Sequence, residues 1–61
     1  MGVAVTVRVE TLTAGQRFRA QDGSVWTYER RDGALSGAYH CVRDDGHRSC
    51  FAGCADVEVL S

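Results

Sequence analysis

The chain has 61 residues, of which 44% are hydrophobic and 25% charged, and its formal net charge is −1. This composition excludes an intrinsically disordered chain, and the near-neutral charge excludes a strong overall attraction to nucleic acid or to an anionic membrane. A chain this short forms one small domain, residues 1–61, and buries only about 60% of the surface that its unfolded form exposes. Domains of this size commonly gain stability from a disulfide, a metal or a partner subunit, so we expect a protein partner or a homo-oligomer.

All seven basic residues are Arg, and the sequence contains no Lys, Ile, Asn or Pro. Residues with GC-rich codons are abundant, which indicates a high-GC bacterium, such as an actinobacterium, or a phage that infects one. The N-terminus lacks the pattern of a signal peptide, and no run of about 18 apolar residues is present. These features predict a cytoplasmic protein, in the host cytoplasm if it is phage-encoded, with no membrane association and with reduced thiols.

The first segment, VAVTVRVE at residues 3–10, alternates with period two and places its four valines on one face. Such alternation of β-branched residues predicts a half-buried strand. Residues 16–20 then set Phe18 between Arg17 and Arg19, which predicts a second and shorter strand.

The dipeptide Asp-Gly occurs three times, at 22–23, 32–33 and 45–46, and each copy is flanked by strand-like residues. Asp-Gly between alternating runs favours a hairpin turn. No segment has the apolar spacing of a helix of about ten residues or more, although residues 52–56 can form one 3₁₀ turn. The remaining predicted strands cover residues 24–30, 38–43, 48–52 and 57–60.

Hairpin register decides which side chains meet, because a slip of one residue moves every side chain to the other face. A two-residue turn at Asp22-Gly23 sets Phe18 opposite Thr27. A three-residue loop with a left-handed glycine pairs Phe18 with Trp26 instead, and the same rule at residues 44–46 pairs Tyr39 with Phe51 and Cys41 with Ser49. We favour the three-residue loops because they gather the aromatic residues into one core: Phe18, Trp26, Tyr28, Tyr39 and Phe51.

Five or six short strands with tight turns, the last pairing back with the first, make a small barrel without unprotected edges. This pattern resembles the small SH3-like barrels of bacterial and phage proteins. The residues that carry the likeness are the V-x-V-x-V strand, Leu12-x-x-Gly15-x-x-Phe18, Asp22-Gly23-x-x-Trp26, Asp45-Gly46 and the closing stretch 51–60. The resemblance implies an all-β, five- to six-stranded SH3-like barrel with at most one 3₁₀ turn, used as a binding module whose ligand the fold does not specify.

Residues 38–54 hold all three cysteines and both histidines. A structural zinc site needs four converging ligands, which here would be Cys41, Cys50, Cys54 and His47. In the three-residue register Cys41 shares a face with His47, while Cys50 shares the opposite face with His40. Neither register gathers three cysteines and one histidine, so we expect no metal and no other cofactor, with cysteine acting as a small buried hydrophobe.

A Cys41–Cys50 disulfide requires the two residues to lie directly opposite each other, which only the two-residue register provides, and a reducing compartment disfavours it. A Cys41 nucleophile with His47 as its base requires a cleft of several hundred Å³, which we do not expect in so small a barrel. We therefore expect no catalytic residues and no enzymatic activity.

Four arginines lie on or near the second and third predicted strands: Arg17, Arg19, Arg30 and Arg31. Beside an exposed Trp26 and Tyr28 they would form a stacking platform for single-stranded nucleic acid. The core needs these aromatic residues, so we expect the arginines to form a solvated face. We favour a small non-enzymatic binding or regulatory module that acts through protein–protein interaction or self-association. The alternatives are a nucleic-acid-binding barrel that uses these arginines and, after it, a small zinc-binding β domain.

Overall fold

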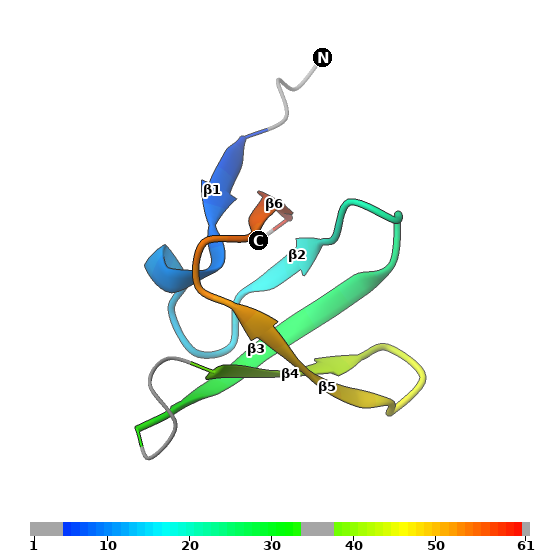
Figure 1. The fold of residues 1–61 in the computed structure, drawn as a ribbon. Coiled ribbons are helices and arrows are strands. Elements are labelled where there is room, and N and C mark those ends of the chain that lie inside the picture. The colour runs from blue at the N-terminus through cyan, green and yellow to red at the C-terminus, as the bar shows by residue number, and fades with distance from the viewer. Residues whose placement is uncertain (1–4, 34–37, 61) are drawn as a thin grey trace.

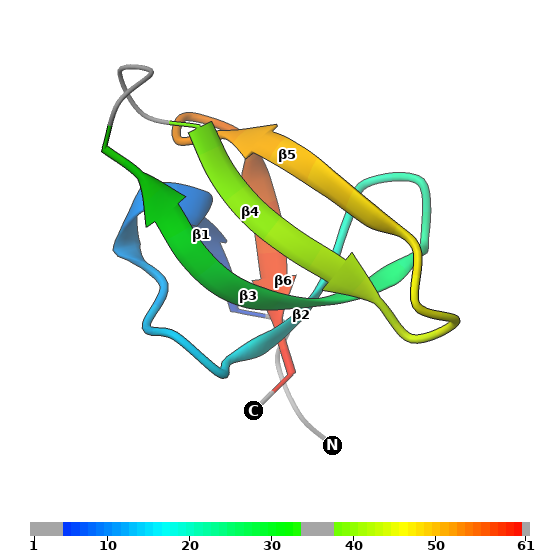
Figure 2. The same ribbon diagram turned by 90° about the horizontal axis from the view of Figure 1, so that it is seen from below.

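The computed structural model describes residues 5–33 and 38–60, and within these ranges the chain forms six antiparallel strands and one 3₁₀ turn. The single sheet has the strand order β1-β6-β2-β3-β4-β5 and curls into a half-barrel (Figures 1 and 2). This architecture fits a small SH3-like barrel and confirms the predicted all-β fold class. The elements are β1 (Thr6–Arg8), η1 (Val9–Thr11), β2 (Arg17–Arg19), β3 (Val25–Asp32), β4 (Ala38–Arg43), β5 (Arg48–Ala52) and β6 (Asp56–Val59).

Two backbone hydrogen bonds connect the ends of the sheet. The Val9 and Glu10 N–H groups, just after β1, donate to the carbonyl oxygens of Ala55 and Gly53, just after β5, each at 3.0 Å. The predicted pairing of the last strand with the first is confirmed, with Val7 opposite Val57. The described part of the chain contains no helix long and apolar enough to cross a membrane.

The N-terminal strand is shorter than the predicted residues 3–10, of which 3 and 4 lie outside the described residues. It ends at Arg8 because the chain turns into η1, where the Leu12 N–H group donates to the Val9 carbonyl. The turn also breaks the predicted valine face, since Val9 is fully buried, Val7 is half-buried and Val5 is 57% exposed. In place of the 3₁₀ turn expected at residues 52–56, the chain forms a single turn, which is closed by a hydrogen bond from the Ala55 N–H group to the Ala52 carbonyl oxygen.

Both predicted three-residue hairpin loops are confirmed. Phe18 pairs with Trp26 across β2 and β3, and Tyr39 pairs with Phe51 across β4 and β5. The loop glycines Gly23 and Gly46 have φ of 91° and 94°, the left-handed conformation that this turn type requires. The aromatic pairs of the core therefore follow from turn chemistry that is visible in the sequence.

A β-bulge in β3 was not anticipated. The pairing of β3 with β4 shifts between Tyr28 and Arg30, so that Arg30 lies opposite His40 and Arg31 lies opposite Tyr39. A bulge inserts one extra residue and bends the strand. It also places these two consecutive arginines differently from what simple alternation along β3 predicts.

The core lies inside the curl of the sheet. Phe18 is completely buried, and Trp26, Tyr28 and Tyr39 are each less than a tenth exposed. Phe51 packs against this core but is only half-buried. The other buried hydrophobic residues among those described are Val9, Leu12, Cys41 and Val57.

Candidate binding site

A hollow of about 350 Å³ opens where the β2–β3 loop meets the chain between β5 and β6. Its volume reaches the lower end of the range of ligand sites, roughly 300–1,000 Å³, so the expectation that the barrel offers no such space is wrong. The space arises because β5 and β6 do not pair with each other. The hollow is lined by Ala20, Gln21, Asp22, Ser24, Trp26, Phe51, Ala55, Asp56 and Val57.

Aromatic rings form the wall of the hollow that adjoins the core. The rings of Trp26 and Phe51 meet edge to face, with centroids 5.1 Å apart, and Phe51 meets the buried Phe18 in the same way at 5.4 Å. Edge-to-face contact is a favourable geometry for aromatic pairs. This wall is therefore apolar and tightly packed.

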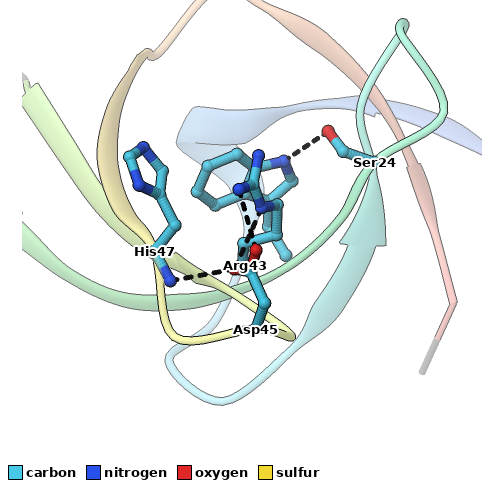
Figure 3. A network of polar contacts seen from close by, with 5 residues as sticks. Ser24, Arg43, Asp45 and His47 are labelled. Carbon is cyan, nitrogen blue, oxygen red and sulfur yellow. Dashed lines mark hydrogen bonds and ion pairs between the residues drawn. The ribbon is translucent and has the colours of Figure 1, made fainter.

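A polar network holds Trp26 in place (Figure 3). The indole Nε1–H group donates to Ser24 Oγ at 2.7 Å, and Ser24 Oγ donates in turn to Asp22 Oδ1 at 2.6 Å. The Arg43 guanidinium lies 5.6 Å from the centre of the indole ring and makes two hydrogen bonds to Asp45, at 3.0 and 2.8 Å. The indole is thus held by a hydrogen bond at its N–H edge and by the guanidinium over its ring, and no buried side-chain N or O atom of the described residues lacks a partner.

The charged side chains that line the hollow are both acidic. Hydrogen bonds from the Ser24 side chain and backbone lower the pKa of Asp22, so this carboxylate stays ionised. Asp56 has no ion-pair partner among the described residues, and no Lys or Arg lines the hollow. The hollow is therefore apolar with two carboxylates at its rim, of which Asp22 also interacts electrostatically with Arg43 beside Trp26.

The four predicted binding arginines do not form one basic patch. Arg17 and Arg19 are exposed on β2, where Asp44 neutralises Arg17 at 2.8 Å and Glu58 neutralises Arg19 at 3.5 Å. Arg31 lies 5.8 Å from the centre of the Tyr39 ring. Arg30 is exposed and makes no ion pair with the described residues, and as the neighbour of Arg31 along β3 it points to the opposite face of the sheet.

The stacking platform of the nucleic-acid alternative is likewise absent from the described surface, because Trp26 and Tyr28 are 6% and 8% exposed. A base can stack only on a ring face that solvent reaches. The two aromatic residues serve the core, as the sequence led us to expect.

The four residues that a zinc site would have needed are spread over the fold. Cys41 is 1% exposed inside the core, while Cys50 and Cys54 are exposed, and all three thiols are free. His47 lies beside Trp26, with ring centroids 6.1 Å apart. No group of three or more Cys, His, Asp or Glu residues within ranges 5–33 and 38–60 is arranged to hold a metal ion.

Cys41 is poorly suited to act as a nucleophile. Burial raises the pKa of its thiol to about 12, with smaller contributions from Cys50 and Glu29, and its Sγ lies 3.7 Å from the Tyr39 carbonyl oxygen. A nucleophilic cysteine requires the thiolate form near neutral pH. The Cys41–His47 pair considered from the sequence therefore lacks a reactive thiol.

Sequence reasoning identified Trp26 and Phe51 only as core residues and did not identify the hollow. Its remaining lining comes from a loop and a connection that meet only because of the way the sheet curls. The one local feature of the sequence that points to this site is the Asp22-Gly23-Ser24 turn, which is followed by Trp26 two residues later. The chain matches no family model, no curated protein and no solved structure, so the site is interpreted from its own geometry.

Proposed function

We propose that this protein is a small non-enzymatic binding module that recognises another protein by accepting one of its side chains in the hollow over Trp26 and Phe51. The observation that carries this proposal is an apolar space of about 350 Å³ beside aromatic rings that are already held in place. A preorganised site of this kind loses little entropy when it binds. The favoured ligand is a segment of a partner protein, because the hollow is open and suited to a single side chain.

The charge of the rim indicates which side chain fits. A side chain that enters this hollow meets apolar walls along its length and the carboxylates of Asp22 and Asp56 at the rim. Arginine and lysine have this character, with an apolar stem and a cationic end. We therefore propose a basic residue of the partner as the group that is recognised.

The nucleic-acid alternative is less well supported. Binding to phosphates requires unpaired cations that act together. Arg17, Arg19 and Arg48 are each paired with a carboxylate, and Arg30 and Arg31 point to opposite faces of β3. These charges give no continuous track for a phosphate backbone.

Selection from a displayed library of random peptides tests the proposal. Ala55 lines the hollow, so Ala55→Leu fills it with apolar atoms, whereas Ala52→Leu makes the same change on the exposed part of β5 as a matched control. We expect selected peptides to contain Arg or Lys beside apolar residues, to bind Ala52→Leu as they bind the unmodified protein, and to lose binding to Ala55→Leu.

A second pair of variants tests the role of the rim. Asp56→Asn should weaken binding about two- to fivefold, as expected for an exposed ion pair of up to about 1 kcal/mol, whereas Asp44→Asn, away from the hollow, should not. Peptides that bind Ala55→Leu equally well would contradict the proposal. Binding to a generic oligonucleotide that falls steeply as salt rises would favour the nucleic-acid alternative instead.

A further inference from the structure

Cys50 and His40 form a close pair on the outer face of the sheet, away from the hollow. Cys50 Sγ lies 3.4 Å from His40 Nδ1, and the two residues are directly opposite each other across β4 and β5. Cys50 is exposed and His40 is half-buried. This pair shares a face, as the three-residue register predicted, but it plays no part in the proposed function.

The register explains why the two side chains meet. The Arg43 N–H group donates to the His47 carbonyl, which makes Arg43 and His47 a hydrogen-bonded pair. Hydrogen-bonded and non-hydrogen-bonded pairs alternate along an antiparallel ladder. His40 and Cys50 lie three pairs further along than Arg43 and His47, so they form a non-hydrogen-bonded pair. Side chains approach most closely at these positions.

The separation of the two donor atoms fits one tetrahedral metal ion. Zinc binds a cysteine sulfur at about 2.3 Å and a histidine nitrogen at about 2.0–2.1 Å, and a tetrahedral angle then sets sulfur and nitrogen about 3.5 Å apart. In the structure, Cys50 Sγ and His40 Nδ1 are 3.4 Å apart. Small side-chain rotations therefore suffice for both atoms to bind one ion.

Each chain supplies only half of such a site. A structural zinc ion takes four protein ligands, and the described residues offer no third Cys, His, Asp or Glu in the same cluster. Two thiolates and two neutral imidazoles neutralise the charge of a divalent ion. The surrounding outer face carries the ion pair between Arg48 and Glu29 and also the exposed Arg30, which lies opposite His40.

We propose that Cys50 and His40 bind a thiophilic divalent metal ion, with Zn²⁺ as the best fit, together with Cys50 and His40 of a second copy. The ion sits between two chains and links their outer faces into a dimer. This inference is independent of the hollow and of the partner proposed for it. It also differs from the zinc set considered from the sequence, which took all four ligands from one chain.

Titration of the full chain with Co²⁺ tests the proposal. We expect thiolate-to-cobalt charge-transfer and tetrahedral ligand-field bands that saturate at half an equivalent of Co²⁺ per chain and disappear when Zn²⁺ is added. Light scattering after size exclusion should show the mass of the chain doubling when Zn²⁺ is added.

Variants then assign the ligands. Cys50→Ser and His40→Gln should each weaken Co²⁺ binding more than about tenfold, since even groups that only orient a ligand contribute about 10–100-fold. Cys54→Ser is the matched control, because Cys54 is also an exposed free thiol and should leave binding unchanged. Circular dichroism confirms that each variant is folded. Saturation at one equivalent by a monomer, an unchanged mass with Zn²⁺, or equal loss in Cys54→Ser would each overturn the proposal.

Discussion

Replacement of Trp26 by alanine should remove most of the stability of this domain. Trp26 is 6% exposed, contacts Phe51 through its ring and is covered by Arg43. Truncation of a buried Trp to Ala typically costs about 3–5 kcal/mol. Below about 70–80 residues a single core rarely supplies more than about 3–5 kcal/mol of stability, so the variant should be largely or completely unfolded.

Urea denaturation followed by far-UV circular dichroism measures this effect. Fluorescence is unsuitable, because Trp26 is the sole tryptophan of the chain. Trp26→Phe is the matched control, since it keeps an aromatic ring and loses the hydrogen bond to Ser24, a bond worth about 1 kcal/mol. A loss of less than about 1 kcal/mol in Trp26→Ala would refute the description of Trp26 as a core residue.

Three further predictions follow from single residues. The raised pKa of Cys41 means that the unfolded chain loses this proton first, so stability should fall between about pH 9 and pH 12, by at most about 1.4 kcal/mol per pH unit. Denaturation curves measured across this pH range should show that the stability of Cys41→Val declines less steeply with pH than that of the unmodified protein. A Cβ at Gly53 would lie 2.8 Å from Tyr39 Cε1, so Gly53→Ala should cost about 1–3 kcal/mol in urea denaturation, while Gly33→Ala, where nothing lies within 4 Å, should cost less than about 0.5 kcal/mol. A chelator should leave the circular dichroism spectrum unchanged, because no group of three or more possible ligands within the described residues holds a metal ion inside the fold of one chain; unfolding in chelator would contradict this.

Turn chemistry made much of the fold predictable from the sequence. Two Asp-Gly turns with left-handed glycines set the hairpin registers, and the registers set which aromatic residues meet. The third Asp-Gly, at 32–33, precedes residues 34–37, which lie outside the described residues. Local signals of this kind are sufficient where a contact joins neighbouring strands.

Features that depend on closure of the sheet were not predictable in the same way. The N-terminal strand ends early because Val9 and Glu10 bond to a segment more than 40 positions away. The β3 bulge, which lies between Tyr28 and Arg30, has no distinct local signal in the sequence. The hollow also depends on this closure, because the β2–β3 loop meets the connection between β5 and β6 only once the sheet has curled.

The most direct test of the proposed function is an NMR titration of the ¹⁵N-labelled protein with N-acetyl-arginine N-methylamide, alongside the citrulline analogue, which has nearly the same shape but no charge. Binding in the hollow predicts saturable shifts of the Trp26 indole N–H signal and of the Ser24, Asp56 and Val57 amides. The citrulline analogue should give markedly weaker shifts, because it cannot pair with the carboxylates of Asp22 and Asp56. Equal shifts with both compounds, or shifts confined to residues outside the hollow, would contradict the account.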